Sequence, residues 1–319
     1  MAAHRRLVIA RGALLAACCA AALALACGQT RGVAAEPPDF DAARAFRDLE
    51  ALVHIGPRPA GSNGAEQARA LIRERLRQAG WLVESQNVTV AKPGGGTALL
   101  VNLVARRAAA PARTLLVTHY DTKNLAGIAF VGANDGASGA AVLLELARAL
   151  AADSPPALEL AFCDGEEAFG ANIDAHDGLY GSKALAQRMA ADGSLAKLER
   201  VILVDMVGDR DLNLATDLGS AEPLRRQFEA ASAKLHFPPP FDPEQQMGVI
   251  DDHSPFQDAG VRDVLVLLDF QYGARSSPGP RWHTDGDVLD AVSADSLDRV
   301  GRPLLAMLRE LDATPLARP

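Results

Sequence analysis

Residues Ala161–Phe169 read A-F-C-D-G-E-E-A-F. They overlap the short, mostly apolar run Leu158–Cys163, which predicts a buried strand. The strand leads through a glycine to two adjacent carboxylates, Glu166 and Glu167. Because neighbouring residues at a strand end point to opposite sides, one carboxylate can face a metal while the other faces whatever the metal polarises. An isolated pair of glutamates is more often a solvated acidic turn, so a metal site needs support from elsewhere in the chain.

Apolar runs alternate with helical patterns through most of the sequence. Further buried strands are expected at residues 114–118, 201–207 and 261–270. Helices are expected from Asp39 or Asp41 to about His54, from Ser62 or Asn63 to Gly80, and at residues 138–152, 179–191, 222–235 and 293–311. Residues 81–91 and 97–105 are predicted to form a hairpin around K-P-G-G-G, and residues 238–243 an irregular loop near the site.

This alternation predicts an α/β fold with a mostly parallel sheet that helices cover on both faces. The hairpin is antiparallel and is expected at one side, which makes the sheet mixed. The sequence contains no internal repeat and no sign of a second core. We therefore expect a single domain from about Asp39 to residue 319.

The composition is that of an ordinary globular protein. Of 319 residues, 49% are hydrophobic and 23% are charged. The 40 acidic residues outnumber the 32 basic ones, for a formal net charge of -8, and no basic stretch is present. A nucleic-acid partner is therefore not expected.

The first 27 residues differ from the rest. Basic residues precede the apolar stretch 12–26, which is short for a membrane span and is typical of a signal peptide. The stretch ends in A-L-A-C, which resembles a bacterial lipoprotein signal with lipid attachment at Cys27. Ordinary cleavage and an uncleaved anchor are the alternatives. Residues 28–38 have a linker composition. We therefore expect export to the periplasm or cell envelope, with membrane contact only through the anchor.

Cysteine usage excludes two classes of protein. Cys18, Cys19 and Cys27 lie in or at the end of the signal segment, which leaves Cys163 for the folded body. No disulfide can form within that body. Because Cys163 belongs to an apolar run, it is expected to be a small buried hydrophobic residue and not the nucleophile of a cysteine hydrolase.

Acids and imidazoles follow several of the expected strands. Ligands bind at the carboxyl ends of the strands in such sheets. The candidate side chains there are His119, Asp121, Glu166, Glu167, Asp205 and Asp209. Asp135 lies between Asn134 and Gly136 where a helix begins, and His283 lies in R-W-H-T-D-G-D. Alone, the aspartate would be a helix cap and the histidine a packed or surface residue. Together they are the residue types that hold zinc.

Six motifs occur in the order seen in one enzyme family. They are H-Y-D-T-K at His119–Lys123, G-A-N-D at Gly132–Asp135, D-G-E-E-A-F at Asp164–Phe169, D-G-L-Y-G-S at Asp177–Ser182, D-D-H-S-P-F at Asp251–Phe256 and W-H-T at Trp282–Thr284. In these motifs the chain resembles the glutaminyl-peptide cyclotransferases, which share the fold of the di-zinc aminopeptidases. The resemblance runs from about Gly56 to the last helix, and so implies a zinc exopeptidase-like fold.

The resemblance also implies roles for single residues. Asp135, Glu167 and His283 would hold one zinc ion, and Glu166 would be the general acid and base. Asp205 and Asp251 would be hydrogen-bonded around that glutamate and raise its pKa. Trp282 would form a wall of the pocket. A cis peptide bond is expected between Asp135 and Gly136.

The implied reaction is cyclisation of the N-terminal glutamine of peptides or proteins to pyroglutamate, with release of ammonia. The sequence departs from the family at two places. Asn172 and Ile173 stand where typical members have a second tryptophan, and Val266 or a neighbour replaces a histidine on the last strand.

Five further residues have less definite roles. Lys123 could touch a substrate carboxylate or carbonyl, and Tyr120 could line the pocket. Asp121 could orient the nearby histidine. Asp285 and Asp287 are expected to be turn residues.

Two other functions compete with the cyclase. In a di-zinc aminopeptidase, His119 and Asp205 would hold a second ion, Asp135 would bridge the two, and Glu166 would activate a water molecule. A tethered binding or scaffold domain would be expected to have lost a zinc ligand or the general base, and this chain retains them all.

Overall fold

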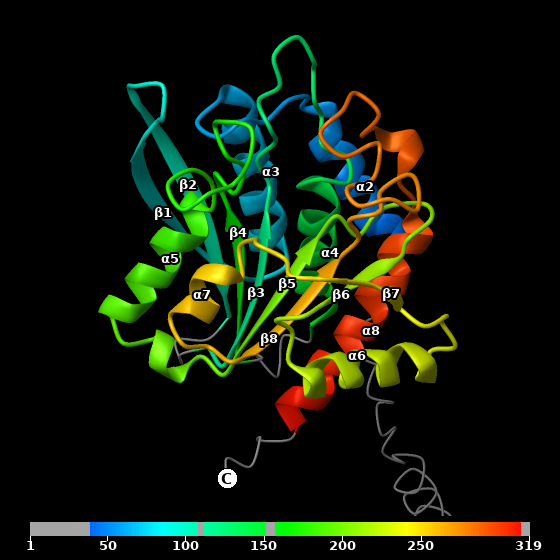
Figure 1. Cartoon of the computed structure of the whole chain (residues 1–319). Helices are drawn as coiled ribbons and strands as arrows, with labels where there is room; N and C mark the ends of the chain where they lie inside the picture. Colours follow the sequence, from blue (N-terminus) through cyan, green and yellow to red (C-terminus); the bar gives the residue numbers. More distant parts are fainter. Residues whose placement is uncertain (1–38, 108–111, 151–156, 314–319) are drawn as a thin grey trace, which may run out of the picture. The chain divides into compact units, whose positions relative to one another are not determined.

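A six-stranded mixed sheet is the centre of the fold (Figure 1). The computed structural model describes residues 39–107, 112–150 and 157–313. The strands, in spatial order, are β1 (Leu82–Ala91), β2 (Thr97–Arg106), β4 (Leu158–Cys163), β3 (Thr114–His119), β5 (Arg200–Asp205) and β8 (Asp263–Leu268). β4, β3, β5 and β8 are parallel, whereas β1 and β2 form an antiparallel hairpin at one side. The predicted mixed α/β sheet is confirmed.

Helices cover both faces of this sheet (Figure 1). One face packs against α2 (Ala42–His54), α3 (Asn63–Gln78), α4 (Ala137–Ala149), α6 (Glu222–Lys234) and α8 (Ala294–Ala313). The other packs against α5 (Tyr180–Ala191) and α7 (Ser254–Asp258). Alternate residues of each central strand enter opposite cores, as Leu116 and Leu115 do on β3. Short 3-10 turns occur at Leu195–Lys197 and Leu289–Ala291.

The predicted helix caps are present. The Asp41 side chain accepts a hydrogen bond from the Arg44 amide, and the Ser62 hydroxyl accepts one from the Ala65 amide. Both satisfy backbone donors that the first helical turn leaves free.

The core helix α4 packs directly on the sheet. A Cβ atom at Gly139 would lie 2.2 Å from the carbonyl oxygen of Val204, so only glycine permits this close approach of helix and strand. Asp135 lies two residues before Ala137, the first residue of α4, so the same packing brings that aspartate to the end of β5.

The prediction of an irregular loop at residues 238–243 is wrong for residues 241–243, which belong to a strand. β7 (Phe241–Met247) pairs in parallel with β6 (Leu214–Asp217) in a separate two-stranded sheet. The sequence F-D-P-E-Q-Q-M lacks a clear apolar alternation. The strand forms because a distant segment supplies its hydrogen-bonding partner, which a local pattern does not reveal.

The signal peptide, the linker and Cys27 lie outside the described residues, and their assignments stay predictions. Among the residues described, none of the helices is long and apolar enough to cross a membrane. Cys163 is a buried free thiol, as expected.

Candidate metal centre

The candidate site lies beyond the carboxyl ends of β3, β4 and β5. His119 is the last residue of β3 and Asp205 the last residue of β5, while Glu166 and Glu167 follow β4 across a tight turn. Gly165 in that turn has φ +74°, a conformation that favours glycine. The parallel arrangement therefore brings these side chains to one edge of the sheet.

One group of potential ligands is Asp135, Glu167 and His283, whose ligand atoms all lie within 4.8 Å of one another. The Nε2 atom of His283 is 3.1 Å from Oε1 of Glu167 and 3.4 Å from Oδ2 of Asp135. Ligand atoms about 2.1 Å from a tetrahedral zinc ion lie about 3.4 Å apart. The spacing therefore matches that of a shared zinc ion.

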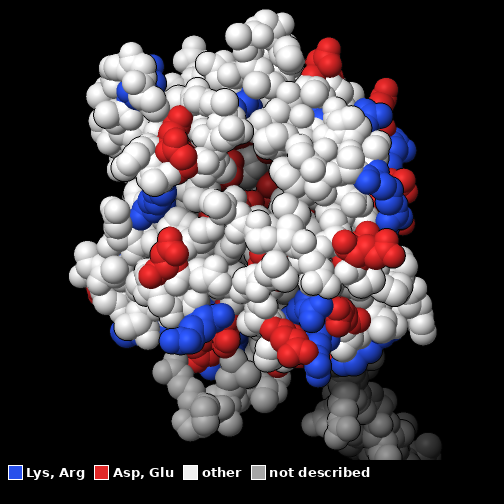
Figure 2. Space-filling view, viewed as in Figure 1, with Lys and Arg blue, Asp and Glu red and all other residues white. Residues whose placement is uncertain are grey.

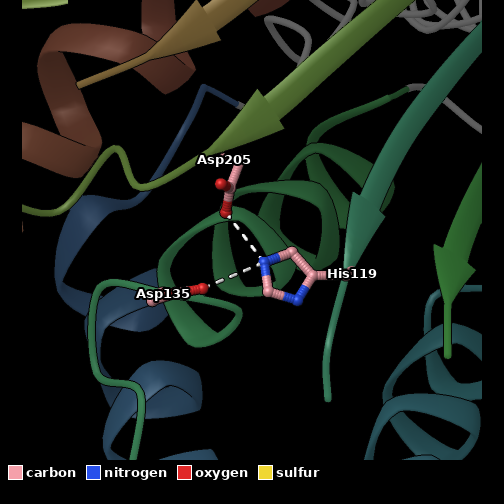
Figure 3. Close-up of side chains that lie close together, drawn as sticks. All are labelled: His119, Asp135 and Asp205. Carbon is pink, nitrogen blue, oxygen red and sulfur yellow. Dashed lines mark hydrogen bonds and ion pairs between the residues drawn. The ribbon is translucent and has the colours of Figure 1, made fainter. Parts of the chain in front are cut away.

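A second group is His119, Asp135 and Asp205 (Figure 3). One ring nitrogen of His119, Nε2, faces both carboxylates, at 3.2 Å from Asp135 and 3.1 Å from Asp205. Asp135 thus belongs to both groups, with Oδ1 toward His119 and Oδ2 toward His283. This is the position of a carboxylate that could bridge two ions.

The electrostatics of the site also suit a cation. Oδ2 of Asp135 is buried and has no hydrogen-bond partner among the described residues. Burial, and then the charge of Asp135, raises the pKa of Glu167. Burial opposes the charged form of His283, but its close contacts with the carboxylates of Asp135 and Glu167 outweigh burial and raise the pKa of His283 to about 9. A divalent ion would relieve the repulsion between these buried carboxylates.

Glu166 is a buried carboxylate beside the first group. Burial raises its pKa well above the ordinary value for a glutamate, and the charges of Asp251, Glu167 and Asp252 raise it further. The pKa of Asp251 is also raised, chiefly by burial and then by Asp205 and Asp252. Such paired acids are suited to sharing and moving a proton.

Asp121 holds the turn that carries the glutamate pair. Its carboxylate accepts hydrogen bonds from the backbone amides of Glu166 at 3.3 Å and Glu167 at 3.4 Å. The same carboxylate lies 3.6 Å from Nδ1 of His119. Asp121 therefore contacts His119, as predicted, and also binds the backbone of the turn after β4.

Asp287 is more than the turn residue expected from the sequence. It is buried, and its carboxylate accepts hydrogen bonds from the backbone amides of Asn134 and Asp135 and from the Tyr272 hydroxyl. Asp285, two residues earlier, is exposed. The sequence alone does not distinguish the two, because the difference lies in which one meets the segment before α4.

No motif in the sequence singles out Arg58. It is fully buried and donates to the backbone carbonyls of Tyr120, Val131 and Gly132. Desolvation lowers its pKa to about 10. The guanidinium group thereby ties together the two ends of the loop that separates β3 from Asp135.

The expected cis peptide bond between Asp135 and Gly136 is wrong. Within the described residues the cis bond precedes Pro278. Gly136 instead turns the chain with φ +87°, and a Cβ there would lie 2.6 Å from the Asp121 carbonyl oxygen. A glycine with positive φ accounts for the tight approach without a cis bond.

A cavity of about 290 Å³ opens over the candidate ligands. Figure 2 shows this face hollowed, with acidic side chains at the floor and mostly uncharged residues around it. Its lining includes Asp135, Glu166, Glu167, Asp205, Asp251, Trp282 and His283. The Trp282 ring stacks on the His283 ring with centroids 3.8 Å apart, so the indole forms a wall beside a potential ligand.

Comparison with known proteins places the chain in a family. A sequence model of peptidase family M28 matches residues 102–308. The chain belongs to peptidase family M28. Glutaminyl-peptide cyclotransferase of Bothrops jararaca is 31% identical over 292 residues, covering 78% of this chain and 76% of that protein.

Solved structures agree with this placement. Glutaminyl cyclase from an Acidobacteriales bacterium has a TM-score of 0.80 and 33% identity, covering 90% of this chain and 99% of that one. A Zn-dependent exopeptidase from Parabacteroides distasonis, 21% identical, shares the fold with a TM-score of 0.75 over 85% of this chain and 99% of that one. The resemblance to glutaminyl-peptide cyclotransferases within a zinc exopeptidase-like fold is confirmed.

The M28 fold does not bring every predicted contact residue to the cavity. Tyr120 is fully buried, donates its hydroxyl to the Val101 carbonyl, and within the described part of the chain does not line the cavity. Lys123 does line it, with Nζ 2.7 Å from the Ala168 carbonyl and 3.6 Å from Oε2 of Glu167. The Tyr120 ring instead packs in the hydrophobic core on one face of the sheet.

Proposed function

We propose that this chain is a zinc-dependent enzyme that cyclises the N-terminal glutamine of peptides and proteins to pyroglutamate, releasing ammonia. The observation that carries the proposal is the convergence of Asp135, Glu167 and His283 on one point, with Glu166 beside them in the same cavity. Family membership and the two relatives named as cyclase and cyclotransferase support it.

The two carboxylates and the imidazole would hold the zinc ion. Their number and type match a catalytic site, which takes three protein ligands and keeps one position open. Bound there, zinc would act as a Lewis acid on the side-chain amide of the glutamine.

Glu166 would carry the proton. It accepts a proton from the substrate's α-amino group as that nitrogen forms a bond to the side-chain amide carbon. It then passes the proton to the amide nitrogen as the carbon–nitrogen bond breaks, and ammonia leaves. Burial and the neighbouring Asp251 raise the pKa of Glu166, so this carboxyl group holds a proton more readily than an ordinary glutamate does.

The cavity would hold the glutamine folded on itself. Both reacting groups belong to one residue, so ring closure is already intramolecular. Confining the glutamine in the cavity would hold the two groups close together and so favour the closure. Trp282 stands as one wall, held in place by stacking on His283 and an edge contact with Phe270. These aromatic contacts limit the space open to the glutamine side chain.

A specific observation favours a second candidate, a two-metal aminopeptidase. His119, Asp135 and Asp205 form a second set of possible ligands that shares Asp135 with the first. In that function the shared carboxylate would bridge two ions and Glu166 would act as the base for a water molecule.

Two measurements on the purified full chain separate the candidates. The first follows ammonia release and the matching mass loss from a peptide beginning with glutamine, with and without chelator, and counts zinc per chain. The second follows amine release from aminoacyl anilides. Chelator-sensitive ammonia release supports the cyclase. Amine release with two zinc ions and no ammonia would replace it with the aminopeptidase.

A further inference from the structure

A second hollow adjoins the candidate active-site cavity. This groove, between α5 and α7, has a volume of about 580 Å³. Most of its lining is apolar, including Ile173, Ala186, Ala190, Ile250, Pro255 and Ala259. Ile173 and Ile250 line both the groove and the active-site cavity, so the two spaces adjoin at these side chains.

Ile250, which the two hollows share, is unusually exposed for an apolar residue. Ile250 is 69% exposed, although it directly precedes the buried Asp251 of the site. The free energy of the system falls when another apolar group covers this isoleucine, because apolar surface is then removed from water. A molecule that fills the cavity and extends past Ile250 would supply that cover.

Two polar side chains that line the groove, Lys183 and Asp174, are already engaged within the protein. The Lys183 ammonium donates to the carbonyls of Gly178 at 2.9 Å and Ala175 at 3.4 Å. The Asp174 carboxylate accepts from the amides of His176 and Asp177. The surface that the groove offers is therefore chiefly apolar.

We infer that this groove binds the residues that follow the N-terminal glutamine of the substrate, and that it prefers apolar side chains there. The inference rests on the proposed function. Both reacting groups of the glutamine must lie in the cavity of about 290 Å³, so the rest of the peptide has to leave it. The groove adjoins the cavity at Ile173 and Ile250, and we assign the route of the peptide to this side.

Substrate length and side chain test the preference. The purified full chain is assayed with glutamine amide, Gln-Gly-Gly amide and Gln-Leu-Leu amide. We expect Gln-Leu-Leu amide to exceed Gln-Gly-Gly amide in kcat/KM by about tenfold, mainly through KM, because apolar burial on this scale is worth about that factor. Equal kcat/KM for the two tripeptides would overturn the inference.

Two matched variants locate the effect. Ala190 lines the groove, whereas Ala191, the next residue of α5, is exposed and lies outside it. Ala190→Trp should remove the advantage of Gln-Leu-Leu amide and leave glutamine amide unchanged, while Ala191→Trp should alter neither. If Ala190→Trp keeps the preference for Gln-Leu-Leu amide, the inference is overturned. The same holds if Ala190→Trp changes only the oligomeric state of the protein and leaves kcat/KM for the peptides unchanged.

Failure of the proposed function gives a different result. If the wild-type chain releases no ammonia from any of the three, the cyclase proposal is wrong, and the groove is tested by binding of fluorescent Gln-Leu-Leu and Gln-Gly-Gly peptides. Tighter binding of the leucine peptide, lost in Ala190→Trp and kept in Ala191→Trp, supports the groove. Equal binding of both peptides would overturn it.

Discussion

The carboxylate of Asp287 accepts a hydrogen bond from the backbone amide of Asp135, with Oδ2 and N 3.1 Å apart. Asp287 lies four residues after His283, so one loop both presents a possible zinc ligand and fixes the backbone of another. The Tyr272 hydroxyl donates to the same carboxylate at 2.7 Å. Two segments far apart in the sequence are thereby held in register at the site.

Asp287→Asn should weaken zinc binding by about 10- to 100-fold, the usual effect of removing a group that orients a ligand. The amide would place an N–H donor where the backbone already presents one. Competition with a zinc-binding dye measures the affinity directly. Asp285→Asn, on the same loop but exposed, is the control and should bind like the wild type. Equal affinities for the two variants would contradict the positioning role.

Glu166→Gln and Glu167→Gln should differ in kind. Glu166→Gln is expected to keep zinc and to lower kcat by about 100- to 10,000-fold, because proton transfer is lost. Glu167→Gln is expected to lose bound zinc, because a neutral amide is a poor ligand beside an imidazole and one carboxylate. Metal analysis of both variants, set beside steady-state rates, checks this. Zinc loss in Glu166→Gln with retention in Glu167→Gln would reverse the assignment.

Asp251→Asn should move the acidic limb of the pH profile of kcat/KM to lower pH. The base must be ionised to work, and activity falls as pH drops through its pKa. Burial and then Asp251 raise the pKa of Glu166, so removing that negative charge lowers the pKa and extends activity toward acid. Asp285→Asn serves as control. An acidic limb that does not move would show that Glu166 and Asp251 are not coupled.

Removal of metal should destabilise the folded chain. The carboxylates of Asp135 and Glu167 are buried close together, and without zinc their repulsion is only partly offset by His283 and Lys123. Zinc at about one hundred times its dissociation constant would stabilise the folded state by about 2.7 kcal/mol. The thermal midpoint should rise by several degrees when zinc is added to chelated protein. The rise should be absent in a variant with both His283→Ala and Glu167→Gln, and its persistence there would mean that zinc binds elsewhere.

Local sequence patterns were enough to predict the fold class and most of the helices and strands. The apolar runs at 114–118 and 158–163 became β3 and β4, because a fully buried strand needs apolar residues on both sides. The strand β7 was not predicted, because its hydrogen-bonding partner β6 lies elsewhere in the sequence and its own composition is mixed. The same limit applies to Tyr120, whose neighbours in the motif face the site while its own ring enters the core.

The sequence by itself determined which chemical groups are available: the adjacent glutamates after a buried strand, the aspartate before a core helix, and the histidine beside a tryptophan. Tertiary structure alone decided that Asp135 faces two histidines at once, that Asp287 and Arg58 hold the surrounding backbone, and that a second groove opens beside the cavity. The physical reason is that residue type is fixed along the chain, whereas distance, burial and charge coupling arise only when remote segments pack against one another.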